Sequence, residues 1–207
     1  MSVPYLRPRR GSKEDPLRIG VLISGGGSGL SALIKHQFSN PSCHETKLII
    51  SDNATARGLN FGVDFGIPAL AIELPEIEDK LQRRIKHEEL IHEKLIQTQI
   101  ELVVLSGYMR ILTPNFVKKW KGRLINIHPS LLPKYPGAHA HRDALDDGAK
   151  ITGCTVHLVD EDVDTGEILA KSEVPIFDND TIETLQERVK KAEHLLYPKV
   201  LDDYCSK

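Results

Sequence analysis

Residues 18–36, with the sequence RIGVLISGGGSGLSALIKH, decide the fold class of this 207-residue chain. They read as a buried strand over Arg18–Ile23, a glycine-rich turn over Ser24–Gly29 and a helix over Leu30–His36. The backbone N–H groups of such a turn, together with the N-terminus of the helix, bind anions such as phosphate. The segment therefore predicts the first unit of an α/β fold and, within it, a phosphate-binding loop.

Short apolar runs and helical patterns go on alternating along the chain. Further strands are predicted at Lys47–Ser51, Ala69–Ile72, Glu101–Ser106 and Leu124–Ile127, and helices at Ile77–Gln97 and at His139–Asp147, the latter ending at Gly148. Such alternation indicates βαβ units, which build a parallel sheet.

The C-terminal part departs from this pattern. Thr152–Val159 and Glu167–Val174 read as strands close enough in sequence to form an antiparallel pair. Asp180 and Glu183 resemble a capping box that opens a last helix, which runs to about Asp202. We therefore predict a Rossmann-like α/β fold, a mostly parallel sheet flanked by helices with an antiparallel strand pair in the C-terminal part.

Composition limits the classes of function. Residues 1–17 are rich in proline and charge and are predicted to be a flexible extension, while 18–207 suit a single domain. A net charge of −2 disfavours nucleic acid as a partner, and no run of about 18 apolar residues is present to span a membrane. Three cysteines without CxxC spacing favour neither disulfides nor zinc. We expect a cytoplasmic protein that acts on small molecules, and the oligomeric state stays open.

Asn126-Ile127-His128-Pro129 and the later Asp164 carry the strongest chemical pattern. Asn126 and His128 are two residues apart, so on a strand both project to one face, where both can donate hydrogen bonds to one oxyanion. Asp164 can then set the protonation of the histidine. These groups suit acyl transfer without a covalent enzyme intermediate. The competing interpretation is a strand that ends in a proline turn, with Asn126 as a turn former and His128 in the core.

The run Asn126–Ala144, NIHPSLLPKYPGAHAHRDA, together with Ser24–Leu30 and Gly153–Gly166, resembles the phosphoribosylglycinamide formyltransferase family. The resemblance extends from about Arg18 to the C-terminus. It implies transfer of the formyl group of 10-formyltetrahydrofolate to the amine of 5'-phosphoribosylglycinamide, giving formylglycinamide ribonucleotide and tetrahydrofolate in de novo purine biosynthesis, without a metal.

The resemblance also implies roles for individual residues. The catalytic residues would be Asn126, His128 and Asp164, with His139 paired to Asp164, while His141 and His157 would be structural. Gly26, Gly27, Ser28, Gly29 and Glu193 would bind the substrate phosphate and ribose, with Gly29 at a position where the family often has asparagine. Arg84, Met109, Arg110, Ile111, Leu112, Val159 and Asp160 would bind the folate.

Several alternatives stay open at this stage. The triad also suits a formyltetrahydrofolate hydrolase or a methionyl-tRNA formyltransferase. We expect neither, because residues 1–17 are too short for the regulatory domain of the first and the sequence ends too early for the RNA-binding domain of the second. Gly27-x-Gly29-x-x-Ala32, with Asp52 as a ribose acid, fits a nucleotide-binding oxidoreductase. His139-x-His141 is a weaker metal motif, because two residues that are two apart on a helix face different ways. The apolar side chains at 109, 111 and 112 also suit simple core packing.

Overall fold

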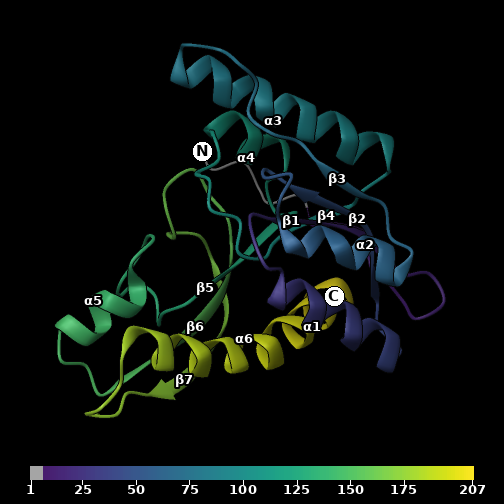
Figure 1. Cartoon of the computed structure of the whole chain (residues 1–207). Coiled ribbons are helices and arrows are strands. Elements are labelled where there is room, and N and C mark those ends of the chain that lie inside the picture. The colour runs from purple at the N-terminus through teal and green to yellow at the C-terminus, as the bar shows by residue number, and fades with distance from the viewer. Residues whose placement is uncertain (1–6) are drawn as a thin grey trace, which may run out of the picture.

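A computed structural model describes residues 7–207 as one seven-stranded sheet with helices on both faces (Figure 1). The strands are β1 (Leu17–Ile23), β2 (His44–Ser51), β3 (Ala69–Ala71), β4 (Leu102–Leu105), β5 (Leu124–His128), β6 (Ile151–Leu158) and β7 (Ile168–Pro175). They lie in the order β3-β2-β1-β4-β5-β6-β7. The first five are parallel, and β6 is antiparallel to both β5 and β7. The predicted fold class is confirmed.

The helices connect these strands. They are α1 (Ser28–Ser39), α2 (Asn60–Phe65), α3 (Lys80–Gln97), α4 (Pro114–Lys119), α5 (Ala140–Asp146) and α6 (Ile182–Cys205), with a 3₁₀ turn at Arg57–Leu59. Within residues 7–207, no helix combines the length and the apolar character needed to cross a membrane.

Two apolar layers hold the helices on the sheet. Successive side chains of a strand point to opposite faces, so Val21 lies in one core and Leu22 in the other. The first core is completed by α1 and α6, through Leu33 and Leu201, and the second by α3, through Leu95. Figure 1 shows α3 and α4 on one side of the sheet and α1 and α6 on the other.

The sheet order places a crevice between the ends of β1 and β4. The chain runs from β1 outward to β2 and β3, then returns to the other side of β1 as β4. Loops that leave the carboxyl ends of two such strands diverge, and ligands bind at this point in open α/β sheets. Here the two loops are joined, because Ser24 N donates to Gly107 O (3.1 Å) and Met109 N to Ser24 Oγ (2.9 Å).

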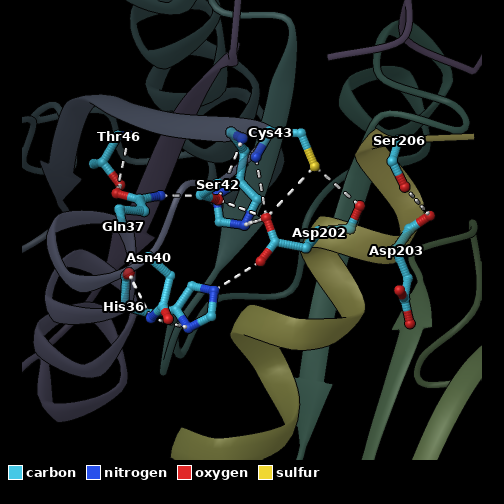
Figure 2. A network of polar contacts seen from close by, with 10 residues as sticks. His36, Gln37, Asn40, Ser42, Cys43, Thr46, Asp202, Asp203 and Ser206 are labelled. Carbon is cyan, nitrogen blue, oxygen red and sulfur yellow. Dashed lines mark hydrogen bonds and ion pairs between the residues drawn. The ribbon is translucent and has the colours of Figure 1, made fainter. Parts of the chain in front are cut away.

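Helix α6 is fixed to α1 by a polar network around Asp202 (Figure 2). The Asp202 carboxylate accepts hydrogen bonds from His36 Nε2 (2.7 Å), Ser42 Oγ (2.6 Å) and Cys43 N (3.1 Å). Burial opposes ionisation of this carboxyl, but the hydrogen bonds outweigh it, and the pKa of Asp202 is lowered. The network fixes the last turn of α6 against the C-terminal end of α1 and the segment that follows it.

Several bounds differ from the sequence prediction, and α3, for example, begins at Lys80 instead of Ile77. The last helix is capped one residue later than expected, by a capping box of Thr181 and Thr184 instead of Asp180 and Glu183. Leu17, placed in the extension, is the first residue of β1. Within the extension, Arg9 forms ion pairs with Asp15 and Glu101. Residues 1–6 lie outside the described part. The flexibility of the extension stays a prediction, because contacts do not measure motion.

Candidate active site

Strand β5 carries the first two residues of the site. Asn126 and His128 point to the same side of the sheet, with Asn126 half-buried and His128 4% exposed. The antiparallel strand β6 places His157 directly opposite Asn126. Three polar side chains therefore meet at the carboxyl end of β5.

Asp164 reaches this cluster from the turn between β6 and β7. Its carboxylate lies 3.3 Å from His128 Nδ1 and 3.6 Å from His157 Nε2, and it accepts a hydrogen bond from Gly137 N at 2.8 Å. The Asp164 side chain is only 10% exposed, and its φ of 57° is left-handed, a conformation that aspartate tolerates better than most residues. The structure thus brings together Asn126, His128 and Asp164, although Asn126 and Asp164 are 38 positions apart in the sequence.

The partners of His128 define its hydrogen positions. Nε2 lies 2.8 Å from the backbone carbonyl of Tyr135, which can only accept, so Nε2 carries a hydrogen. Nδ1 faces the Asp164 carboxylate, which also accepts when ionised. Both ring nitrogens of His128 therefore face hydrogen-bond acceptors, and Nδ1 is the nitrogen on the Asp164 side.

A different set of partners favours a neutral ring at His157. Its Nδ1 donates to Leu158 O at 2.9 Å, which leaves Nε2 as the acceptor for Asn126 Nδ2 at 3.2 Å. Burial lowers the pKa of His157, and the nearby His128 lowers it further against the opposite effect of Leu158 O and Asp164. His157 therefore orients the carboxamide of Asn126.

This placement bears on two predictions. His157 was expected to be structural, and this stays a prediction, although the pairing of β5 with β6 places His157 beside Asn126. His139 was expected to pair with Asp164, but among residues 7–207 the histidines that pair with Asp164 are His128 and His157. His139 is exposed at the N-cap of α5.

The metal alternative finds no support in the described chain. His141, two residues into α5, is half-buried, and burial lowers its pKa. No group of three or more histidine, cysteine, aspartate or glutamate side chains in residues 7–207 has an arrangement that could bind a metal ion.

The glycine-rich loop lies beside this cluster at the crevice. Gly26 is exposed, Gly27 takes a left-handed φ of 68° before α1, and Ser28 is the first residue of that helix. A Cβ atom at Gly29 would lie 2.5 Å from Ser106 Oγ, so a side chain there requires Ser106 to move.

Helix α6 supplies two further polar groups to the loop. His194 Nε2 lies 3.3 Å from Ser28 Oγ, so the middle of α6 faces the start of α1. Glu193 precedes it, and burial raises the pKa of its carboxyl to about 7, against a smaller opposing effect of Lys190.

The segment predicted to bind folate follows β4. Met109 and Ile111 are 73% and 60% exposed, which contradicts simple core packing for these two, whereas Leu112 is buried in the core. Arg110 Nε lies 2.5 Å from Asp52 Oδ2. Asp52 is thus buried and paired, which makes it a poor ribose acid for the oxidoreductase alternative.

The remaining predicted folate contacts lie around this segment. Arg84 is exposed on α3, one turn before Glu88, whose carboxylate accepts a hydrogen bond from Thr113 N at 2.8 Å. Val159 and Asp160 follow β6, where Thr165 Oγ1 donates to Asp160 Oδ1 at 2.7 Å.

A separate cavity of about 350 Å³ lies near the start of β2. Its walls include Gln37, Phe38, His44 and Phe65, and none of the predicted site residues is among the described residues that line it. The candidate active site is instead identified by its chemistry, at the carboxyl ends of β1, β4 and β5.

Comparison with known proteins agrees with this geometry. A family model described as formyl transferase matches residues 17–201. The phosphoribosylglycinamide formyltransferase of Escherichia coli (strain K12) is 40% identical over 185 residues, which cover 89% of this chain and 85% of that protein. A crystal structure of phosphoribosylglycinamide formyltransferase from Brucella melitensis superposes with a TM-score of 0.85 at 42% identity, covering 93% of this chain and 97% of that one.

Longer relatives contain a matching region too. The trifunctional purine biosynthetic protein adenosine-3 of Chironomus tentans is 48% identical over 186 residues, which cover 89% of this chain and 13% of that protein. The chain spans only 13% to 18% of the length of such relatives. Since the family match covers nearly the whole described structure, this chain belongs to the formyl transferase family.

Proposed function

We propose that this protein transfers the formyl group of 10-formyltetrahydrofolate to the amine of 5'-phosphoribosylglycinamide, a step of de novo purine biosynthesis. The observation that carries the proposal is the meeting of Asn126, His128 and Asp164 beside the glycine-rich loop. A carboxamide, an imidazolium and a carboxylate are the groups that this transfer needs, and no nucleophilic side chain is required.

The phosphate and ribose of the acceptor bind where the glycine-rich loop and the start of α1 face the middle of α6. Backbone N–H groups around Gly26, Gly27, Ser28 and Gly29 bind the phosphate with the help of the N-terminus of α1. Glu193 accepts hydrogen bonds from the ribose hydroxyls. The 3.3 Å contact between His194 and Ser28 supports this placement, because it brings α6 to the loop.

The folate lies along the loop after β4. The exposed side chains of Met109 and Ile111 suit the flat pteridine, and Arg110, Leu112, Val159 and Asp160 complete the pocket. The exposed Arg84 on α3 binds the charged tail of the folate. The high exposure of two apolar side chains is what supports this assignment, since apolar surface of this kind often marks a binding site.

The chemical step begins when the amine nitrogen attacks the formyl carbon. A new C–N bond forms, and the carbonyl oxygen becomes an oxyanion. This oxyanion accepts a hydrogen bond from Asn126 and shares the Nδ1–H of His128 with the Asp164 carboxylate. The bond between the formyl carbon and N10 of the folate then breaks, and the carbonyl is restored.

Proton transfer from the amine to the leaving folate nitrogen completes the reaction. The attacking amine loses one proton and the leaving folate nitrogen gains one, so no net proton is consumed. Asp164 stabilises the imidazolium of His128 and relays the proton through a water.

Binding of small molecules, not nucleic acid, fits the net charge of −2. The three free cysteines suit a reducing cytoplasm.

Two alternatives use the same groups with a different acceptor. A hydrolase transfers the formyl group to water, and a methionyl-tRNA formyltransferase to a charged tRNA. The test is formyl transfer measured by formation of tetrahydrofolate, with 5'-phosphoribosylglycinamide, with methionyl-tRNA and without an acceptor. We expect turnover only with the ribonucleotide, and equal turnover without any acceptor would instead identify a hydrolase.

A further inference from the structure

A buried turn lies behind His128, on the side of the ring away from Asp164. In this Ser130–Tyr135 turn, the carbonyl of Tyr135 accepts the hydrogen of His128 Nε2 at 2.8 Å. Tyr135 has a left-handed φ of 56°, which costs free energy for any residue except glycine and aims the carbonyl at the ring. The conformation therefore needs support from neighbouring groups.

Ser130 gives that support from within the turn. Its side chain is fully buried, and its hydroxyl lies 2.6 Å from Lys134 O and 3.2 Å from Tyr135 O. One O–H group thus faces two consecutive carbonyls and fixes their direction. Loss of this hydroxyl would free the carbonyl that bonds His128.

The turn is also fixed from the sheet. Thr155 on β6 donates from Oγ1 to Ser130 O at 2.7 Å and accepts at the same oxygen from Leu132 N at 3.1 Å. Lys171 on β7 donates to Leu132 O. The position of the Tyr135 carbonyl is therefore determined by buried bonds that touch neither substrate site.

From these contacts we propose that Ser130 is a positioning residue that sets the protonation pattern of His128. If the Tyr135 carbonyl is fixed, a neutral ring must point a lone pair either at that carbonyl or at Asp164. The doubly protonated ring satisfies both acceptors. Ser130 thus favours the form whose Nδ1–H donates to the oxyanion. The catalytic consequence rests on the proposed function, but the effect on the ring does not.

The first experiment is ¹⁵N NMR of the histidine rings in the free protein at pH 7.5. Wild type, Ser130→Ala and Ser42→Ala are compared, and the His128 signals are assigned by their loss in His128→Ala. Ser42 is a matched control, because its hydroxyl donates to Asp202 far from His128. We expect Ser130→Ala to shift the two His128 ring nitrogens toward the neutral pattern, and Ser42→Ala to leave them unchanged.

The second experiment is a double-mutant cycle in the formyl transfer assay. Ser130→Ala should lower kcat about tenfold to a hundredfold with KM within about twofold, since a misplaced catalytic group has costs of this size. In the His128→Ala background the same substitution should have no further effect, because Ser130 acts through that ring. An equal loss in both backgrounds would overturn the proposal.

A third variant covers the case in which Ser130→Ala does not fold. Thr155→Val keeps the shape of the side chain and removes the hydroxyl that bonds Ser130 O and Leu132 N. It should shift the His128 ring nitrogens in the same direction by a smaller amount. Unchanged His128 signals in every folded variant of the turn would contradict the role of Ser130, even if formyl transfer itself is confirmed.

Discussion

Asn126 and His157 face each other across strands β5 and β6, with 3.2 Å between Asn126 Nδ2 and His157 Nε2. Because His157 Nδ1 is committed to Leu158 O, this bond fixes which end of the carboxamide is the NH₂ group. One hydrogen of Nδ2 bonds His157, and the other is free to face a ligand. The oxyanion donor is therefore oriented before any substrate binds.

The first prediction concerns the two oxyanion donors. Asn126→Ala and His128→Ala should each lower turnover by about two to three decades, because each removes one donor from the developing charge. Steady-state kinetics with circular dichroism as a check of folding measures this. Asn40→Ala, a surface substitution on the far side of α1, is the control. A folded Asn126→Ala with nearly normal turnover would refute the oxyanion assignment.

The second prediction concerns His157, whose lowered pKa affects stability. An unfolded histidine takes up a proton below about pH 6.5, whereas the folded one does so only at lower pH, so stability falls as pH drops through this window. His157→Gln should remove this contribution. Urea unfolding at pH 7 and pH 5 should therefore show a smaller acid loss in the variant, and an unaltered loss would exclude a neutral His157.

The same variant should also impair catalysis. His157→Gln leaves the Asn126 carboxamide without its fixed acceptor, so we expect kcat to fall about tenfold by misorientation. KM for both substrates should change little. A change confined to KM would place His157 in substrate binding instead.

The third prediction concerns Asp164, which lies 3.3 Å from His128 Nδ1. Asp164→Asn should keep ligand binding but lose most turnover, since an amide does not stabilise the imidazolium as a carboxylate does. Calorimetric binding of 5'-phosphoribosylglycinamide separates the two effects. Asp160→Asn, in the same turn region, is a comparison that should affect folate binding more than turnover. Loss of acceptor binding in Asp164→Asn would argue for a structural role.

The fourth prediction concerns Glu193, whose pKa is raised to about 7 by burial. Between its ordinary value near 4.5 and about 7, the folded state binds more protons than the unfolded state, so stability decreases as pH rises. Glu193→Gln should therefore gain stability relative to wild type from pH 5 to pH 8. Chemical denaturation at both pH values tests the sign, and a gain that is equal at pH 5 and pH 8 would contradict the raised pKa.

The fifth prediction is that turnover does not need a metal ion, which rests on the chemistry of the proposed donors. Dialysis against a strong chelator should leave the rate unchanged. Activity that is lost on dialysis and restored by zinc would revive the metal interpretation of His139 and His141.

The fold was largely predictable, because the spacing of apolar residues typical of strands and helices can be read directly from the sequence. Apolar runs at β1, β4 and β5 and the glycine-rich turn after β1 identify βαβ units without any long-range information. Helix ends were less certain, since either Asp180 or Thr181 could cap α6 by residue type, and only the backbone geometry selects Thr181.

The site was predictable only in part. Asn126 and His128 are close in sequence and share a strand face, so their joint role could be inferred from spacing. The position of His157 depends on the pairing of β5 with β6, and the carbonyl of Tyr135 has no residue-type signature at all. Exposure of Met109 next to buried Leu112 likewise depends on how the loop after β4 leaves the sheet.

The most direct test of the central claim is a single assay of formyl transfer. Purified protein is mixed with 10-formyltetrahydrofolate and 5'-phosphoribosylglycinamide, and tetrahydrofolate and formylglycinamide ribonucleotide are quantified with and without the acceptor. The geometry around Asn126, His128 and Asp164 predicts equal amounts of both products, formed only when the acceptor is present. Release of tetrahydrofolate without the acceptor, or no formylated ribonucleotide with it, would contradict the claim.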